Sequence, residues 1–131
     1  DILNDHSISV FNNNSKDFAK GDVGDGNNQV LIYNFKTNNY SLYNEDSMRE
    51  NDIRTITNGR RQILPNGDLF IEETDYGRTL YFNADGSLMW THVNRANDGN
   101  VYPLGWSRIL YTKEDIQTVN NFLINKGTCN E

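Results

Sequence analysis

The strongest constraint on the fold is a turn-and-strand pattern that fills residues 63–90 (ILPNGDLFIEETDYGRTLYFNADGSLMW). Two turn sequences, Asn66-Gly67 and Asp85-Gly86, separate runs in which apolar residues recur at every second position. Glycine supplies the positive φ angle that a tight hairpin turn requires, and a period of two places alternate side chains on one side of a strand. The pattern therefore predicts an antiparallel β-meander in which one side of each strand packs against apolar neighbours: Leu69 and Ile71, Leu80 and Phe82, Leu88 and Trp90.

A weaker copy of this pattern lies upstream. Ile8 aligns with Leu69 and Val10 with Ile71, and residues 33–43 repeat the second half of the pattern. Four short strands in about forty residues is the size of a propeller blade. The sequence therefore predicts an all-β fold made of antiparallel, four-stranded propeller blades.

The alternation also predicts individual strands and a core. The expected strands are residues 7–11, 30–35, 40–43, 53–57, 62–64, 69–72, 79–82 and 88–93. The side chains expected to be largely buried are Tyr33, Phe35, Leu69, Ile71, Leu80, Phe82 and Trp90. Burial of Trp90 is the check on the blade register. Residues 12–28 have no apolar period and are predicted to form a surface loop.

The period changes near the C-terminal end. Residues 101–111 (VYPLGWSRILY) are predicted to form a strand with a Pro-Gly break. Residues 112–115 (TKED) match a capping box, and the apolar stripe that follows predicts a short amphipathic helix, expected to dock on the sheet edges. The expected organisation is about two and a half blade repeats in residues 1–111, the helix in 112–127 and a tail in 128–131.

Composition and charge limit the functions that the chain can have. With 131 residues and 36% hydrophobic residues, it suits one domain with a modest core. The net charge is −6 and the twelve Lys and Arg residues are scattered, so nucleic-acid binding is not expected. The sequence has no apolar run of about eighteen residues, so no membrane span is expected.

The start of the chain and its single cysteine indicate a piece of a longer protein. The chain begins with Asp1 and has no signal peptide, which is expected of a fragment. Its single cysteine, Cys129, is expected to be either a free thiol or a disulfide partner of a segment outside this chain.

Residues 22–27 are rich in oxygen ligands but miss the EF-hand spacing, so a solvated turn is expected. No Cys/His cluster or phosphate loop occurs, and neither a metal nor a cofactor is expected.

Three segments resemble the bacterial arylsulfotransferase-like propeller proteins: residues 62–71 (QILPNGDLFI), residues 76–78 (YGR) and residues 85–90 (DGSLMW). Blades of that family repeat a Leu-Pro-Asn-Gly-Asn-Thr-Leu-Ile strand, a Gly-Arg pair that opens the next strand, and a Gly-x-x-x-Trp close. The resemblance covers about residues 1–95 and corresponds to the family's C-terminal blades. Related quinoprotein-type (PQQ-type) propellers share the same turn, strand and tryptophan pattern.

The resemblance implies an exported, six-bladed propeller. It also implies transfer of a sulfuryl group from a phenolic sulfate ester to a phenol through a histidine intermediate, without a nucleotide sulfate donor. The family's histidine would lie at or before Asp1, while His6 falls on a turn position. The family's Ser-Arg pair meets Asn28 and Gln29 here, and Gln29 lacks the charge of a guanidinium.

Arg108, Arg61 and His92 are the candidate site residues. Arg108 resembles an aromatic-x-Arg element near the family's C-terminus. Arg60 and Arg61 precede a strand that enters the central channel in family members, so a guanidinium there could reach an anionic ligand or form a surface ion pair. His92 is either a half-exposed histidine beside an aromatic residue or a catalytic base. Arg78 is expected to hold a neighbouring loop carboxylate.

The expected function is that of a secreted or periplasmic, arylsulfotransferase-like propeller fragment, itself non-catalytic, which serves binding or assembly. The alternative is the C-terminal part of an active aryl sulfotransferase, and a third hypothesis is a self-standing β domain with a helix. The expected partners are another polypeptide segment that completes the propeller or a second copy, together with a small phenolic or anionic ligand. An unclosed propeller would leave strand edges and apolar faces exposed to water.

Overall fold

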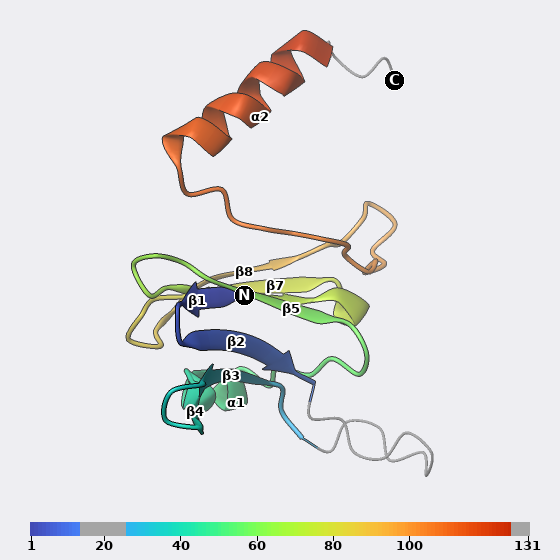
Figure 1. The fold of residues 1–131 in the computed structure, drawn as a ribbon. Coiled ribbons are helices and arrows are strands. Elements are labelled where there is room, and N and C mark those ends of the chain that lie inside the picture. Colours follow the sequence, from blue (N-terminus) through green and yellow to red (C-terminus); the bar gives the residue numbers. More distant parts are fainter. Residues whose placement is uncertain (14–25, 127–131) are drawn as a thin grey trace.

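Two antiparallel sheets of four strands follow one another in a computed structural model, which describes residues 1–13 and 26–126 (Figure 1). The N-terminal sheet contains, in spatial order, β1 (Ile2–Asn4), β2 (Ser7–Asn12), β3 (Gln29–Asn34) and β4 (Asn39–Tyr43). The C-terminal sheet contains β5 (Gly59–Ile63), β6 (Leu69–Glu73), β7 (Arg78–Phe82) and β8 (Leu88–Val93). Each strand thus pairs with its neighbour in sequence, as expected of the predicted meanders.

Three helical segments complete the described chain. The helix α1 (Glu45–Glu50) and the irregular linker after it connect the two sheets, and the 3-10 turn η2 (Thr74–Tyr76) lies between β6 and β7. An extended segment leads from β8 to α2 (Lys113–Lys126), which stands apart from the sheets in Figure 1.

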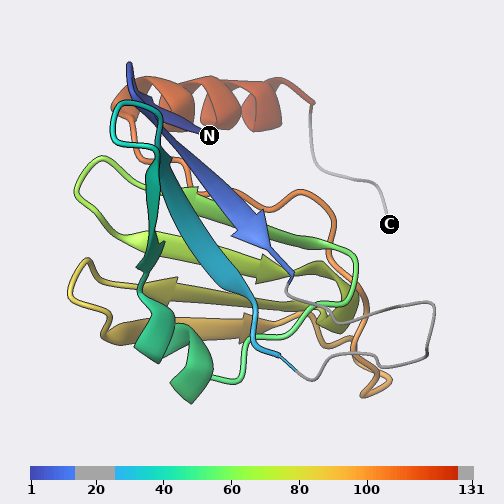
Figure 2. The ribbon, with the colours of Figure 1, turned by 60° about the horizontal axis from the view of Figure 1, so that its bottom comes forward.

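The core lies between the two sheets, whose strands cross at an angle (Figure 2). The fully buried apolar side chains of the N-terminal half are Val30, Met48 and Ile53; those of the C-terminal sheet are Leu69, Ile71, Leu80 and Phe82. Gly59 on β5 permits this close approach, because a Cβ atom there would overlap the ring of Phe11 from β2.

The central part of the predicted meander is confirmed. Gly67 and Gly86 have φ angles of 86° and 89°, the left-handed conformation that the turns require. In β6 and β7 the Cα partners include Leu69 with Phe82 and Ile71 with Leu80. These four side chains are at most 1% exposed, so they occupy one buried face, as the alternation predicts.

The predicted burial of Trp90 is wrong, since this side chain is 41% exposed. The register between β7 and β8 shifts, so that Leu88 pairs with Phe82 but Trp90 pairs with Tyr81. A shift of one residue moves every later side chain to the opposite face of a strand. Trp90 therefore lies on the outer face, stacked on Tyr81 with 5.5 Å between the ring centroids.

The predicted burial of Phe35 is also wrong. Phe35 is 59% exposed, and Tyr33 is only partly buried. The two rings meet edge to face at a centroid distance of 5.0 Å. Phe35 lies just beyond the end of β3, and no described element covers the side of the sheet that Tyr33 faces.

The strand predicted at residues 53–57 is absent, and three elements, β1, α1 and η2, are not among the predictions. Ile53 is a buried apolar residue of the linker. The N–H groups of the next two residues, Arg54 and Thr55, donate to the side chains of Glu73 and Asn28 rather than to a neighbouring strand. The helix α1 escapes prediction because it is short and its N-cap, Asn44, makes no side-chain capping bond. The short strand β1 was also not predicted.

The strand predicted at residues 101–111 is absent as well, apart from an isolated bridge between Arg95 and Val101. The backbone of this segment bonds to side chains and turns instead. The N–H of Leu104 donates to the carbonyl of Thr74 over 3.1 Å, and the N–H of Ile109 donates to the side-chain oxygen of Gln62 over 2.8 Å. These irregular partners do not form a ladder.

The C-terminal helix is confirmed, but its docking is not. The N–H of Asp115 donates to Oγ1 of Thr112 over 3.0 Å, the N-cap bond that the sequence predicts, while the Asp115 carboxylate accepts from the Thr112 hydroxyl over 2.7 Å rather than from the Thr112 N–H of a full capping box. The apolar stripe is exposed, with Leu123 at 60%, so the prediction that it docks on the sheet edges is wrong. Among the described residues, no helix is long and apolar enough to cross a membrane.

Some predictions fall on residues outside the described ranges. These are most of the surface loop at 12–28, the first four residues of the turn at 22–27 and the state of Cys129. The ends of that loop are described: Asn28 is 1% exposed, and its side-chain nitrogen donates to the carbonyl of Asn13 over 2.6 Å.

Candidate functional site

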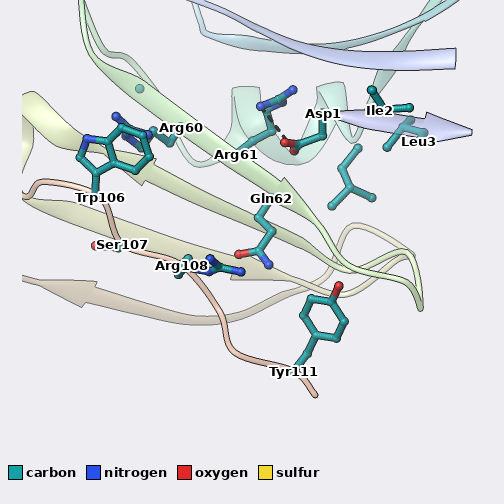
Figure 3. A pocket seen from close by; sticks show the side chains of 12 residues that line it. Asp1, Ile2, Leu3, Arg60, Arg61, Gln62, Trp106, Ser107, Arg108 and Tyr111 are labelled. Atoms are coloured by element: carbon teal, nitrogen blue, oxygen red, sulfur yellow. Dashed lines mark ion pairs between the residues drawn. The ribbon is translucent and has the colours of Figure 1, made fainter. Parts of the chain in front are cut away.

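A pocket of about 680 Å³ lies where the start of β1, the strand β5 and the segment before α2 come together (Figure 3). Its lining includes three arginines, Arg60, Arg61 and Arg108. Trp106 and Tyr111 line the side formed by the C-terminal segment, and Asp1 lies on the opposite side. The N-terminal residues and the segment before α2 therefore meet over β5.

Arg61 fastens the two sheets to each other. Its Nη2 donates to the Ser9 hydroxyl over 2.9 Å and to the Ser9 carbonyl, and its Nη1 lies 3.5 Å from the Asp1 carboxylate. Its side chain is only 14% exposed, and burial lowers the pKa of the guanidinium. Nε of Arg61 is buried without a hydrogen-bond partner among the described residues. Arg61 thus contributes charge to the pocket while its Nη2 is held by Ser9 and its Nη1 is paired with Asp1.

Arg60 and Trp106 form the second wall. The guanidinium carbon of Arg60 lies 3.5 Å from the centroid of the Trp106 ring, a cation–π contact. Trp106 is 78% exposed and has a φ angle of 68°, which is unusual for a residue with a large side chain. An indole held in this way presents a wide aromatic surface at the pocket rim.

Glu72 fixes the C-terminal segment to the sheet. This carboxylate on β6 is fully buried and accepts hydrogen bonds from the N–H of Ser107 and from the Thr74 hydroxyl, the latter over 2.6 Å. Burial alone would raise the pKa of Glu72, but these hydrogen bonds outweigh it and hold the pKa below its ordinary value. The carboxylate therefore stays charged and supports the loop that carries Trp106.

Arg108 is placed between two anchored neighbours. Ser107 is held by Glu72, and Ile109 exchanges two hydrogen bonds with the Gln62 side chain, of 2.8 and 3.1 Å. Figure 3 shows the Arg108 side chain directed toward Gln62 across the pocket. Within the described part of the chain, no ion pair or hydrogen bond occupies its guanidinium, so this arginine has donors to offer a ligand.

His92 is not part of this pocket. It is exposed on β8, where it pairs with Thr79, and it is absent from the pocket lining. His6 lies in the turn between β1 and β2, as predicted. The structure thus places Arg61 and Arg108 in the lining of one pocket and leaves His92 elsewhere. No group of three His, Cys, Asp or Glu residues that could hold a metal ion occurs in residues 1–13 and 26–126.

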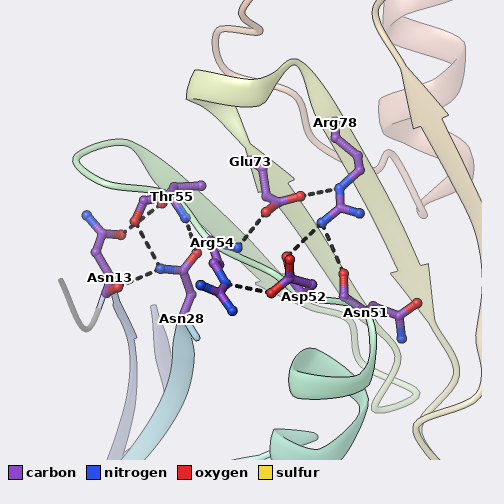
Figure 4. Close-up of polar contacts among 8 residues, drawn as sticks. All are labelled: Asn13, Asn28, Asn51, Asp52, Arg54, Thr55, Glu73 and Arg78. Atoms are coloured by element: carbon purple, nitrogen blue, oxygen red, sulfur yellow. Dashed lines mark hydrogen bonds and ion pairs between the residues drawn. The ribbon is translucent and has the colours of Figure 1, made fainter. Parts of the chain in front are cut away.

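A second polar cluster joins the sheets near the linker (Figure 4). Arg78 holds a carboxylate, as predicted, but this belongs to Glu73 at the end of β6 rather than to a loop. Arg78 also donates to the carbonyls of Asn51 and Asp52, each over 3.1 Å. These bonds tie the linker to the C-terminal sheet.

Asn28 makes a matching connection at the other end of the linker. Its side chain donates to the carbonyl of Thr55 over 3.1 Å and accepts from the N–H of Thr55 over 2.6 Å (Figure 4). At the position where the family's serine was expected, this chain therefore has a buried structural amide. The neighbouring Gln29 bonds to Asn12 on the adjacent strand over 3.3 Å.

The sequence interpretation missed the supporting residues Glu72 and Gln62. The sequence does contain one indication, because two glutamates directly follow the apolar residues of β6. A carboxylate buried at such a position requires a hydrogen-bond or ion-pair partner. The partners themselves lie 35 and 47 residues away in sequence, and no periodicity connects them.

Comparison with known proteins identifies a family. The family model for arylsulfotransferase (ASST) matches residues 1–95, which is more than half of the 131 residues. No curated protein and no solved structure matches the chain. The match covers both sheets and ends just after β8, before the segment that carries Trp106 and Arg108. The chain belongs to the arylsulfotransferase (ASST) family.

Proposed function

We propose that this arylsulfotransferase-related chain binds a small aromatic anion, of the aryl sulfate class, in the pocket between β5 and the C-terminal segment. The observation that carries the proposal is the convergence of Arg60, Arg61 and Arg108 on one pocket beside Trp106. These arginines come from two segments that are far apart in the sequence.

The chemistry of the pocket suits such a ligand. A guanidinium presents several N–H donors in a fixed plane and forms charge-assisted hydrogen bonds with sulfate-type oxygens. Arg108 has donors that no described residue uses, and Trp106 offers a ring on which an aryl group can stack. A volume of about 680 Å³ lies within the usual range for small-molecule sites.

The role proposed for residues 1–131 alone is binding rather than catalysis. Sulfuryl transfer through a covalent intermediate needs a positioned nucleophile. Neither His6 nor His92 lines the pocket, which supports a non-catalytic role in binding or assembly. No geometric observation favours the alternative of an active aryl sulfotransferase over this one.

A second part of the proposal concerns the architecture of the protein and its location. We infer that the two sheets are adjoining blades of an exported, six-bladed propeller, secreted or periplasmic. The support for the architecture is the family membership together with the repeat of the four-stranded antiparallel sheet. The support for export is the family membership alone.

Isothermal titration with 4-nitrophenyl sulfate and with uncharged 4-nitrophenol tests the binding site. We expect the sulfate ester to bind more tightly, and Arg108→Gln to weaken its binding about tenfold, because a charge-assisted contact contributes about 1.5–3 kcal/mol. Arg49→Gln is the matched control, since Arg49 is exposed on α1 and pairs with Glu45 and Asp46. Equal affinity for the two compounds, or no effect of Arg108→Gln, would contradict the proposal.

A further inference from the structure

We propose that the outer face of the N-terminal sheet is a docking surface for a further four-stranded antiparallel sheet of this same repeat, supplied by polypeptide other than residues 1–131. The outer face comprises Ile8, Val10, Leu31, Tyr33 and Tyr40, from β2, β3 and β4. This inference extends the proposed propeller by naming the surface and its occupant, and it does not depend on anion binding.

The outer face is apolar and open. Its residues line a shallow pocket of about 460 Å³ with almost no polar surface. Val10 is 43% and Tyr40 66% exposed, and no described element packs over them. The face extends to Phe35, which is 59% exposed beside Tyr33. Contiguous apolar surface of this kind marks an interaction site.

The sequence repeat shows which face of the C-terminal sheet is equivalent to the outer face of the N-terminal sheet. In the N-terminal sheet Ile8 pairs with Tyr33 and Val10 with Leu31. In the C-terminal sheet Leu69 pairs with Phe82 and Ile71 with Leu80, at the same places in the second and third strands. The outer face therefore corresponds, position by position, to the buried face formed by Leu69, Ile71, Leu80 and Phe82.

The chain itself shows what covers such a face. The buried face of the C-terminal sheet is at most 1% exposed because the other side of the N-terminal sheet packs on it, together with Met48 of α1 and Ile53 of the linker. That side presents the apolar residues Val30 and Phe11 and the small residue Ser9, which receives Arg61. We therefore expect the occupant to be another sheet with a similar side, since equivalent apolar faces favour equivalent partners.

A second copy stacked in the same direction is disfavoured. It would have to present the outer side of its C-terminal sheet, which carries Gln62, Glu72 and Trp90. The C-terminal segment is fastened over that side by the bonds from Gln62 to Ile109 and from Glu72 to Ser107. Docking would require these buried hydrogen bonds to break, which carries a desolvation cost.

Photo-crosslinking in the protein expressed from its complete gene tests the occupant. A benzoylphenylalanine is placed at Tyr40 and, as a control, at Tyr76, which is also exposed, at 49%, but lies in η2. We expect position 40 to crosslink to a peptide outside residues 1–131 that carries the turn-and-alternation pattern. A crosslink to a second copy of residues 1–131, or no crosslink above that at position 76, would overturn the proposal.

A paired stability measurement in the same complete protein gives an independent result. Leu31 and Leu80 occupy equivalent repeat positions, but only Leu80 is fully buried within the described chain. If a sheet covers the outer face, Leu31→Ala should lower the urea midpoint by at least half as much as Leu80→Ala. Val93→Ala, at a 38% exposed position on β8, is the control. An unchanged midpoint for Leu31→Ala would show that the face stays open.

Discussion

At the scale of single residues, buried charges hold together segments that are distant in sequence. Glu72 and Glu73 are neighbours on β6, and both are at most 1% exposed. Because alternate residues of a strand face opposite sides, Glu73 reaches Arg78 and the linker, while Glu72 reaches the C-terminal segment. The strand β6 is thereby bonded to the linker on one side and to the C-terminal segment on the other.

Glu72→Gln is predicted to lower the free energy of unfolding by about 1–3 kcal/mol near neutral pH, because a charged acceptor of two hydrogen bonds is replaced by a neutral amide. The folded-state pKa of Glu72 lies below the ordinary value of 4.5. Its contribution is therefore present above that pH and is lost as the pH falls through the folded-state pKa.

Urea unfolding between neutral and acidic pH measures this effect. The variant should lose stability near neutral pH and should show a smaller further loss on acidification than the parent. Glu50→Gln is the control, since Glu50 is exposed on α1. The same pH dependence in parent and Glu72→Gln would show that this carboxylate does not fasten the segment.

At the scale of elements, α2 differs from the strands in how it is stabilised. The helix has no buried residue, with Phe122 59% and Ile124 77% exposed. Most helices in proteins gain stability from packing one apolar face. In the described structure α2 has instead its own N-cap, in which Thr112 bonds to the N–H and to the carboxylate of Asp115.

Thr112→Ala is therefore predicted to destabilise α2 selectively, by about 0.5–2 kcal/mol, the usual cost of losing an N-cap. Amide hydrogen exchange should become faster within α2 and stay unchanged in the sheets. Thr118→Ala, an exposed position inside the helix, should have the opposite effect, since alanine is the better helix former. Equal protection of α2 in the parent and in Thr112→Ala would mean that packing, not capping, holds this helix.

At the scale of the whole molecule, two sheets share one core and leave two unlike outer sides. One side is the open apolar face of the N-terminal sheet. The other is partly covered by the segment that carries Trp106 and Arg108. The arginine pocket lies where that segment, β1 and β5 meet, so it depends on the packing of both sheets.

Residues 1–131 alone are predicted not to transfer sulfuryl groups from 4-nitrophenyl sulfate to a phenol. The reason is that the arginine pocket holds cationic groups but no histidine that could act as nucleophile. Release of 4-nitrophenol in the presence of an acceptor phenol measures turnover. Turnover that disappears on changing His6 or His92 would refute the prediction.

The sequence by itself determined the features that depend on local chemistry. The turns at Gly67 and Gly86 follow from the need for positive φ angles. The buried face of β6 and β7 follows from apolar residues at every second position, and β8 (Leu88–Val93) has the predicted bounds. The helix after Thr112 follows from its N-cap residue. Each of these features is decided by residues within a few positions of one another.

Only the tertiary structure decided what depends on distant partners. The bulge in β8 turns Trp90 to the outer side, which a periodic pattern cannot show. Residues 101–111 have a strand-like sequence, but their backbone groups bond to Gln62 and Glu72 instead of a strand. The meeting of Arg61 and Arg108 has the same origin, because it requires the folded C-terminal segment to cross β5.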